Sequence, residues 1–345
     1  MSYSTCVLNR KNLYENLEQI KKYCPNVFAM VKANAYGHGV KNVCKLLYGK
    51  VDFFGVACLE EALEIRKFDK RSNILIVGIC KDIFLAIKNN ISFTIENLDD
   101  FKSLLKFIKK HEKLLKNHKK IAKIHIKINS GMNRLGFNKV EEFKKLLNIY
   151  FKFIYKKYIK IEGVFTHFAS RKQLKNQVYK FKEFLSVIPS LINPIVHIGG
   201  GIGKYAIKEF ENAMLRVGID LYTNPCYVLT ISSEIIKVFS VKAGEYVGYD
   251  NGYKTQSLEK IAVVPLGYAD GINRKVSGEF VTINKRRYKI VGNICMDMFF
   301  VKVDESVKRG DTVKINFEGW AEKCGTIPYE ILTSIKHRRM KDLII

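Results

Sequence analysis

The stretch NVFAMVKANAYGHG, residues 26–39, opens as an apolar run and carries one lysine, Lys32, where the run ends. A short apolar run bounded by small and turn-forming residues is typical of a buried strand. We therefore expect a strand over 27–31 that ends on Lys32. The small residues and Tyr36 that follow should let the next helix begin at once.

Segments of the same kind recur through the first two thirds of the chain, and amphipathic helical patterns separate most of them. Such alternation favours parallel strands joined by crossover helices. Eight strand-and-helix units within about 220 residues have the number and size of a (β/α)8 barrel, the TIM-like fold. After the strand at 27–31, we expect strands at 53–57, 74–78, 92–95, 123–128, 162–168, 194–199 and 214–219.

The pattern changes after Tyr227, where β-rich runs separated by turn residues replace the alternation. Runs of this kind indicate an antiparallel β domain. We therefore predict an α/β protein of two domains, a barrel over 1–227 and a mainly antiparallel β domain over 228–345. A helical segment at 327–339 is expected to close the chain.

The composition is that of a globular protein with a basic surface. The chain has 345 residues, 47% of them hydrophobic, and a formal net charge of +26. In 101–120, apolar residues recur at helix spacing and lysines fill the other positions, which indicates a solvated face and no nucleic-acid site. No apolar run is long enough to span a membrane and the first residues lack an apolar signal core, so we expect no membrane partner and a cytoplasmic location.

The eight cysteines show no metal-binding spacing. No two of them form a C-x-x-C pair, and they are scattered through apolar segments. We interpret them as free thiols, and their spacing gives no support for a zinc site, so no metal is expected. They are Cys6, Cys24, Cys44, Cys58, Cys80, Cys226, Cys295 and Cys324.

In a (β/α)8 barrel, polar residues at the carboxyl ends of the strands form the active site. Applied to the expected strands, this rule brings two lysines, two histidines and an arginine to one barrel mouth. The histidines also fit a purely structural interpretation, and the second lysine could be an interior lysine paired with a carboxylate. The five residues are Lys32, Lys127, His167, His197 and Arg216.

The run GGGIG, residues 199–203, follows the seventh expected strand. Loops after strands seven and eight often bind phosphate in these barrels, and glycines let backbone amides approach an anion. A buried lysine has a lowered pKa and is nucleophilic, so Lys32 beside a phosphate site points to pyridoxal 5'-phosphate held as a Schiff base. From the spacing alone, a lysine that reaches the surface from a strand end is an equal alternative.

The sequence also resembles a known family. VKANAYGHG is similar to the cofactor-lysine motif of the bacterial alanine racemases, pyridoxal-phosphate enzymes built of a barrel and a β domain. The resemblance runs through the whole chain in the family's order, which makes it highly specific. Its further motifs are KINSGMNRLGF, GVFTHFA, MLRVGIDLY, AGEYVGY, PLGYADGINR, VGNICMD and TIPYEILTSI.

The resemblance implies an enzyme that interconverts L-alanine and D-alanine through a pyridoxal-phosphate aldimine and supplies D-alanine for peptidoglycan. Lys32 would bind the cofactor and act as one catalytic base. Tyr268, in GYADG, would be the opposite base, contributed by the partner subunit of a homodimer with shared active sites. Racemisation removes the α-proton from one face of the substrate and returns a proton to the other, so it needs a base on each side.

The resemblance further implies how the cofactor and the substrate are held. Tyr36, Tyr329 and the backbone at Gly200 and Gly201 would bind the phosphate, and Arg216 would face the pyridine nitrogen. Arg134 would contact the phenolic-oxygen side of the cofactor and the substrate, and Lys127, a lysine that is often carbamylated in the family, would position this arginine. His167 would form a hydrogen bond with Tyr268, and Met296 would lie at the edge of the substrate pocket.

Five positions, in three places of the chain, depart from the family's pattern. Gly199–Gly201 stand where the family usually has an Ala-Asn-Ser sequence whose serine binds phosphate, Asn129 replaces a common aspartate, and Asn293 replaces an arginine. Phosphate binding would then depend on backbone amides and tyrosines. The changes at Gly200 and Asn293 could loosen the substrate selectivity, so serine or a broader set of amino acids is an alternative to alanine.

Two other classes of protein share parts of this pattern. Barrel decarboxylases of basic amino acids share the lysine and a glycine-rich phosphate loop, but they lack the GYADG tyrosine. Non-catalytic pyridoxal-phosphate carriers have the barrel alone, and the region from about Val228 onward argues against them. The remaining histidines, His38, His111, His118 and His337, are expected at the surface.

Overall fold

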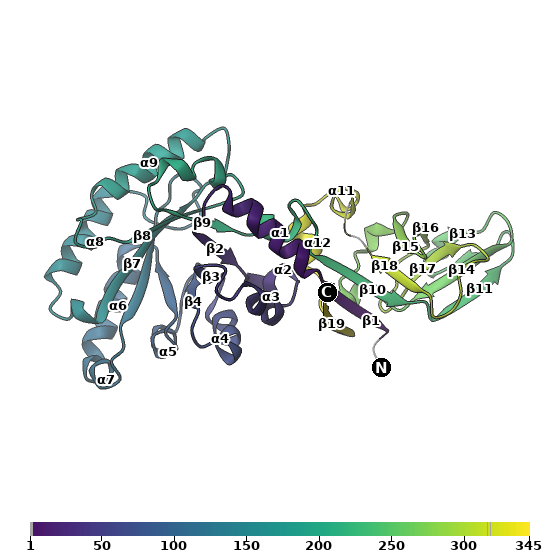
Figure 1. Ribbon diagram of the computed structural model, residues 1–345, viewed down its shortest axis with the longest axis horizontal. Helices are drawn as coiled ribbons and strands as arrows, with labels where there is room; N and C mark the ends of the chain where they lie inside the picture. The colour runs from purple at the N-terminus through teal and green to yellow at the C-terminus, as the bar shows by residue number, and fades with distance from the viewer. Residues whose placement is uncertain (1–2, 316, 318) are drawn as a thin grey trace. The chain divides into compact units, whose positions relative to one another are not determined.

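The computed structural model describes residues 3–315, 317 and 319–345 and contains two compact units, each described here by itself (Figure 1). One unit consists of Asn16–Ala33 and Val43–Pro225 and contains the barrel. The other consists of Met1–Glu15, Asn34–Asn42 and Cys226–Ile345 and contains the large β sheet. The domain boundary after Tyr227 stays a prediction.

The first unit is built around eight parallel strands that close into a barrel. Each strand pairs with its sequence neighbours, and the first pairs with the eighth. The expected barrel is therefore confirmed, with boundaries shifted by a few residues. The strands are β2 (Val27–Met30), β3 (Phe53–Val56), β4 (Asn73–Ile76), β5 (Ser92–Ile95), β6 (Ala122–Lys127), β7 (Ile159–His167), β8 (Ile195–Gly199) and β9 (Met214–Val217).

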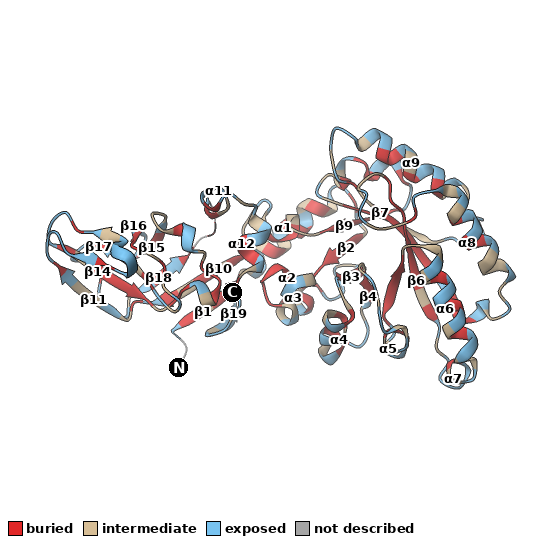
Figure 2. Cartoon of the chain, turned by 180° about the vertical axis from the view of Figure 1, so that it is seen from behind, coloured by how far each residue is buried: buried red, intermediate tan, exposed pale blue. Residues whose placement is uncertain are grey.

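Amphipathic helices connect the barrel strands, with buried faces toward the strands and exposed faces outward (Figure 2). In α6 (Leu98–Lys110) the apolar residues Phe101, Leu104 and Ile108 are buried, as its sequence pattern predicts. No helix in the described residues is long and apolar enough to cross a membrane. Further helices up to residue 223 are α1 (Arg10–Lys21), α3 (Val40–Leu47), α4 (Leu59–Phe68), α5 (Ile83–Lys88), α7 (Glu112–Asn117), α8 (Val140–Lys152), α9 (Leu174–Ser186) and α10 (Asp220–Thr223).

The segment after β2 does not continue as an ordinary right-handed helix. In α2 (Lys32–Tyr36), the φ angles from Ala33 to Tyr36 lie between 50° and 54°, and Gly37 follows at 80°. Left-handed residues other than glycine cost roughly 1–2 kcal/mol each, because Cβ crowds the backbone. A helical segment therefore begins at once, as expected, but it is left-handed, and the right-handed helix α3 begins only at Val40.

The second unit contains a nine-stranded sheet in the order β11-β14-β17-β16-β15-β18-β10-β1-β19. Its neighbouring strands are antiparallel, apart from the parallel pair β1–β19 among the described residues. This confirms a mainly antiparallel β domain. The strands are β1 (Ser4–Leu8), β10 (Leu229–Glu234), β11 (Lys237–Val241), β14 (Glu259–Val264), β15 (Phe280–Ile283), β16 (Arg286–Val291), β17 (Phe299–Val303), β18 (Thr312–Ile315) and β19 (Met340–Ile344), and a separate pair is formed by β12 (Tyr246–Val247) and β13 (Tyr253–Lys254).

Two strands of this sheet were not expected from the sequence. β1 comes from the N-terminal end of the chain, and β19 from the C-terminal end. The predicted helix at 327–339 is confirmed only for α12 (Pro328–Thr333), and the chain closes on β19 instead. A short helix, α11 (Trp320–Cys324), precedes α12.

Aromatic side chains fill the centre of the barrel. Phe28 is fully buried and stacks on Phe53, with ring centroids 5.0 Å apart, and on His197, at 4.9 Å. Phe165 stacks on the same His197 ring at 4.6 Å. The barrel interior is therefore a packed core with an imidazole between two phenyl rings.

We expect Phe28→Ala to lower the free energy of unfolding by about 3–5 kcal/mol, because it leaves a cavity inside the barrel. Urea unfolding followed by far-UV circular dichroism measures the change. Phe84→Ala removes an exposed ring on α5 and is the matched control, with a much smaller loss. Equal losses in the two variants would contradict a stabilising role for the aromatic centre.

Candidate functional site

Four of the five residues predicted at the barrel mouth occupy the carboxyl-terminal half of a strand or one of the two residues after it. Lys32 is the second residue after β2, Lys127 ends β6, His167 ends β7, and Arg216 is the third residue of β9. Burial lowers the pKa of the Lys32 amine, and the positive charges of Arg134 and Arg216 lower it further. These residues therefore lie within electrostatic reach of one another, as expected of a barrel mouth.

Lys127 is buried and has an unusual electrostatic environment. Burial lowers the pKa of its amine to about 8, and the charges of Arg134 and Arg216 act in the same direction. Glu96 is the carboxylate that opposes this shift. A lysine with such a pKa is partly neutral near pH 8, so its amine is a nucleophile there.

Arg216 is the centre of the hydrogen bonds beneath the mouth. Its guanidinium is buried and donates to Nδ1 of His197 at 2.8 Å and to the carbonyl of Thr166 at 2.9 Å. A longer contact of 3.5 Å joins it to Nδ1 of His167. The guanidinium also lies 4.8 Å from the centre of the Phe165 ring.

The hydrogen bonds continue from Arg216 into the barrel interior. Nε2 of His197 lies 2.9 Å from Nδ1 of His125, and Nε2 of His125 lies 3.2 Å from Oε2 of Glu162. The same carboxylate oxygen accepts a 2.5 Å hydrogen bond from the hydroxyl of Ser92. A guanidinium, two imidazoles and a carboxylate thus form one chain, and both histidines are fully buried.

The direction of every bond in this chain follows from Arg216, because a guanidinium only donates. His197 therefore accepts at Nδ1 and donates from Nε2, and His125 does the same toward Glu162. Both imidazoles are neutral in this arrangement, in agreement with the lowered pKa values that burial gives them. Burial alone would raise the pKa of Glu162, but the hydrogen bonds from His125 and Ser92 outweigh it and hold the pKa at about 2.

His167 is kept neutral at the mouth. Burial lowers the pKa of its imidazole to about 3, and Arg216 and Arg134 contribute in the same direction. A neutral imidazole with Arg216 near Nδ1 keeps Nε2 as a donor. The predicted hydrogen bond from His167 to Tyr268 stays a prediction.

The glycines after β8 form a turn in which side chains would not fit. A Cβ on Gly199 would lie 2.3 Å from the Arg216 guanidinium, and a Cβ on Gly200, whose φ is +101°, would lie 2.4 Å from the carbonyl oxygen of Phe168. A Cβ on Gly201 would meet nothing within 4 Å. The turn is therefore tight on the strand side and open at Gly201, where backbone can approach an anion.

In the second unit, the structure brings together the two tyrosines predicted to bind phosphate. Tyr36 is the last residue of the left-handed segment α2, and Tyr329 lies in α12. Their ring centroids are 5.9 Å apart. A Cβ on Gly37 would lie 2.0 Å from the carbonyl oxygen of Leu332, so this turn lies directly on the end of α12. Residues nearly 300 positions apart in the sequence therefore lie next to each other in this unit.

Tyr268 and Met296 also lie side by side. The amide of Tyr268 donates to the carbonyl of Cys295 at 3.0 Å, and the amide of Ala269 donates to the carbonyl of Met296 at 3.0 Å. A Cβ on Gly267 would lie 2.3 Å from both carbonyl oxygens, so only glycine permits this approach. The side chains of Tyr268 and Met296 are exposed.

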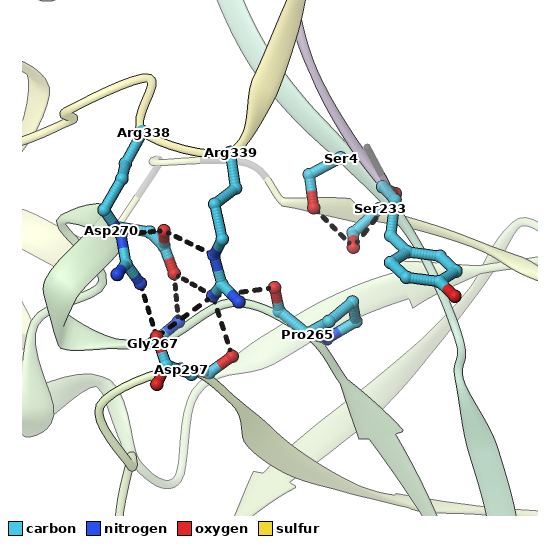
Figure 3. Close-up of polar contacts among 9 residues, drawn as sticks. Ser4, Ser233, Pro265, Gly267, Asp270, Asp297, Arg338 and Arg339 are labelled. Atoms are coloured by element: carbon cyan, nitrogen blue, oxygen red, sulfur yellow. Dashed lines mark hydrogen bonds and ion pairs between the residues drawn. The ribbon is translucent and has the colours of Figure 1, made fainter. Parts of the chain in front are cut away.

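A buried carboxylate fixes the turn that carries Tyr268 (Figure 3). Asp270 is fully buried and accepts from the amide of Gly267 at 3.0 Å and from Arg339 at 2.7 Å, with Arg338 at 3.2 Å. Both arginines also contact Asp297. The segment before β19 therefore holds the GYADG turn through two cations on one carboxylate.

Three further residues singled out in the sequence are either exposed or bonded to neighbouring loops. Arg134 is exposed, and Asn129 is buried and bonds the side chains of Asn133 and Asn138. Asn293 donates to the carbonyl of Tyr249 at 2.9 Å. Asn129 thus organises its own loop.

Of the four histidines expected at the surface, His118 is exposed and His111 is partly covered, whereas the other two are covered by tertiary contacts. His38 is 2% exposed, burial lowers its pKa to about 4, and its Nδ1 donates to the carbonyls of Ala35 and Tyr36. His337 is largely covered and contacts side chains from both ends of the chain. For both, the surface prediction is wrong, because tertiary contacts of the left-handed turn cover them.

The sequence analysis did not single out Glu162, His125, Asp270 or Arg339. The sequence did offer a clue to His125, which lies two residues before Lys127 on β6. Because strand side chains alternate between faces, the two side chains point to the same face of the strand. Asp270 and Arg339 offered no signal, because 69 residues separate them and only the fold joins them.

Comparison with known proteins covers the whole chain. Models of the alanine racemase N-terminal domain and C-terminal domain match residues 8–225 and 228–343. An alanine racemase from Streptococcus suis is 33% identical over 96% of this chain and 95% of its own. A solved alanine racemase from Clostridium difficile 630 is 30% identical, with a TM-score of 0.85, over 100% of this chain and 96% of that one. A histidine racemase from Leuconostoc mesenteroides has a TM-score of 0.87 at 21% identity, covering 100% and 98%, which shows the shared fold alone.

The chain combines a (β/α)8 barrel with a mainly antiparallel β domain, the two-domain arrangement of the racemases that it matches. The chain belongs to the alanine racemase family, since the two family models together match most of its length. It is accordingly an isomerase of amino acids, and the family uses pyridoxal 5'-phosphate.

We expect Glu162→Gln to lower the free energy of unfolding at pH 7 by about 1–3 kcal/mol, because a charge-assisted hydrogen bond becomes a neutral one. The folded-state pKa of Glu162, about 2, lies below the ordinary value of 4.5. Its stabilisation is therefore present above pH 4.5 and is lost as the pH falls toward 2. Urea unfolding at several pH values should show the two proteins converging only below about pH 4.5.

Glu141→Gln, at an exposed glutamate of α8, is the control and should change little at any pH. ¹⁵N NMR of the imidazoles adds a direct measurement of the tautomers of His125 and His197. A protonated imidazole at either residue at pH 7 would contradict the hydrogen-bond directions.

Proposed function

We propose that this protein interconverts L-alanine and D-alanine by two-base proton transfer, with Lys32 and Tyr268 as bases and pyridoxal 5'-phosphate as cofactor. The observation that carries the proposal is the environment of Lys32. Its amine follows a barrel strand, and burial together with Arg134 and Arg216 lowers its pKa. Such an amine is more readily neutral, as needed both to bind a carbonyl carbon and to accept a proton.

The residues of the barrel fit the chemical groups of pyridoxal phosphate. Lys32 suits the aldehyde, and the open backbone at Gly201 with the cationic mouth suits the phosphate. Arg216 suits a ring nitrogen that accepts a hydrogen bond. His197 and Thr166 already bind this guanidinium and hold it in place.

When bound, pyridoxal phosphate withdraws electrons from the α-carbon of the amino acid and eases removal of its α-proton. Arg216 would donate to the ring nitrogen without giving up its proton and so leave that nitrogen unprotonated. Lys32 would move the proton on one face and Tyr268 on the other. His167, kept neutral by burial and by the surrounding cations, would donate from Nε2 to the tyrosine oxygen.

The two bases belong to different units of the chain. We propose that Tyr268 of the partner subunit completes each site, so that the protein acts as a homodimer with shared active sites. The anchoring of the GYADG turn on Asp270 supports this, because it keeps an exposed tyrosine in a fixed position. The D-alanine formed would be supplied for peptidoglycan.

Alanine is the proposed substrate. The residues that depart from the family's pattern indicate which other amino acids the pocket could accept. Gly200 and Asn293 place less bulk where the family carries longer side chains. The histidine racemase of the same fold acts on a larger substrate, as its name says. Serine and histidine are therefore the amino acids to compare with alanine.

The protein with pyridoxal phosphate and L-alanine in D2O should yield D-alanine that carries deuterium at the α-carbon, detected by NMR and chiral chromatography. Lys32→Ala should lose both this activity and the absorbance of bound cofactor. L-serine and L-histidine in parallel reactions rank the substrates. Bound cofactor without exchange on any of the three would overturn the racemase proposal.

Tyr268→Phe tests the second base within the same assay. It should slow the reaction from L-alanine by at least about a hundredfold, the lower range for a general base, while cofactor stays bound. Tyr249→Phe, an exposed tyrosine of the same unit, is the matched control. Unchanged racemisation by Tyr268→Phe would remove this residue from the mechanism.

We further propose that Lys127 reacts with CO2 to form a carbamate and a released proton. Its amine has a pKa of about 8, and Arg134 and Arg216 would stabilise the negative carbamate. In ¹³C-bicarbonate, a carbamate signal should grow as the pH rises through about 8 and be absent in Lys127→Arg. Lys123→Arg, on the same strand, should keep the signal. A signal of equal size in both variants would contradict carbamylation of Lys127.

A further inference from the structure

The two ends of the chain meet at β1 and β19. In this parallel pair Cys6 lies opposite Asp342 in the strand register. Residues paired in a ladder point to the same face of a sheet, so the thiol and the carboxylate are neighbours. Ser4, Cys6 and Leu8 form the buried face of β1, whereas Asp342 is exposed.

His337 completes this group from the segment before β19. Its Nε2 lies 3.5 Å from Sγ of Cys6 and 2.7 Å from the carbonyl oxygen of Gly37. Its Nδ1 lies 2.8 Å from Oδ1 of Asp342. Within the described part of the chain, this is the one group of three His, Cys, Asp or Glu residues whose ligand atoms all lie within 4.8 Å of one another.

We propose that Cys6, His337 and Asp342 form a binding site for a divalent transition-metal ion of the zinc class. A thiolate, an imidazole and a carboxylate are the three side-chain ligands that Zn²⁺ takes in proteins. Tetrahedral bonds of about 2.3 Å to sulfur and 2.0–2.1 Å to nitrogen place those two atoms about 3.5 Å apart. The distance from Sγ of Cys6 to Nε2 of His337 already has this value.

Oxygen atoms flank both nitrogens of the imidazole. Oδ1 of Asp342 lies beside Nδ1 and the carbonyl of Gly37 beside Nε2, so an ion on Nε2 would replace the Gly37 contact, and Asp342 would turn from Nδ1 toward the ion to add its carboxylate. A carboxylate beside a metal-binding histidine also orients the ring. The exposed side of Asp342 gives an ion a path from solvent to the half-covered site.

A catalytic triad of the same three residues is the competing interpretation. The thiol of Cys6 is only 2% exposed, so no substrate carbonyl could reach it. Burial and the Asp342 charge raise the pKa of this thiol to about 12, which opposes a free thiolate nucleophile. A metal ion, in contrast, displaces the thiol proton to solvent and compensates the charge.

The ion would join segments that are far apart in the sequence. Cys6 is on the N-terminal strand, and His337 and Asp342 belong to the C-terminal segment. An ion that binds only the folded state raises the free energy of unfolding in proportion to the logarithm of the free ion concentration divided by Kd, once that concentration exceeds Kd. The site would therefore tie down both termini of the sheet, and this role does not depend on the proposed racemase activity.

Titration of the full-length, chelator-treated protein with Co²⁺ tests the site. We expect one equivalent of Co²⁺ to bind with a near-ultraviolet thiolate-to-cobalt charge-transfer band, and Zn²⁺ to displace it. Cys6→Ala should lose the band, and Asp342→Asn should weaken binding by about tenfold or more. Cys324→Ala removes another buried thiol of the same unit and should keep both the charge-transfer band and the binding affinity of the native protein.

Circular dichroism of each variant establishes that it is folded. If Cys6→Ala does not fold, the charge-transfer band is measured in His337→Gln and Asp342→Asn instead, and both variants should bind Co²⁺ more weakly than the native protein. Absence of a charge-transfer band in the native protein would overturn the proposal. So would a band that persists in Cys6→Ala or that disappears equally in Cys324→Ala, since the metal would then bind elsewhere.

Discussion

The permanent positive charge of Arg216 is the constraint on which the interior of the barrel depends. A guanidinium keeps all its protons, so each neighbour must accept from it. This sets the tautomer of His197, then that of His125, and finally requires an acceptor, which is Glu162. The buried cation and its counter-charge are thus separated by two neutral imidazoles. The same chain fixes the guanidinium at the mouth, where a cofactor nitrogen would meet it.

The β-sheet unit uses the same principle at the Tyr268 turn. A buried carboxylate is stable only when hydrogen bonds and cations compensate its desolvation. Asp270 obtains both, from the Gly267 amide and from two arginines that precede β19. An exposed tyrosine is therefore carried by a rigid turn. In each unit a buried carboxylate fixes a residue of the proposed reaction, through a buried arginine in the barrel and through two exposed arginines in the β-sheet unit.

The left-handed turn after Lys32 shows a different use of local contacts. Its backbone conformation is unfavourable for residues other than glycine, so neighbouring groups must hold it. Asn34 accepts from the amide of Val40, His38 bonds the carbonyls of Ala35 and Tyr36, and the end of α12 covers Gly37. Tyr36 is thereby directed to Tyr329. The strain is located at the residues that would bind phosphate, where a fixed position matters most.

The sequence by itself determined the eight barrel strands, the change to an antiparallel sheet, and the lysine at the end of β2. These features depend on short-range periodicity, which is visible along the chain. The handedness of the turn after Lys32, the parallel pair β1–β19, and the partners Glu162, Asp270 and His337 were decided only by the tertiary structure. The strand pair and the three partners depend on contacts between residues distant in sequence, whose spacing carries no signal. The handedness of the turn depends on local hydrogen bonds together with one distant contact, that of Gly37 with the end of α12. The cysteine spacing could not point to the proposed metal site, since Cys6 and Asp342 become neighbours only through strand register.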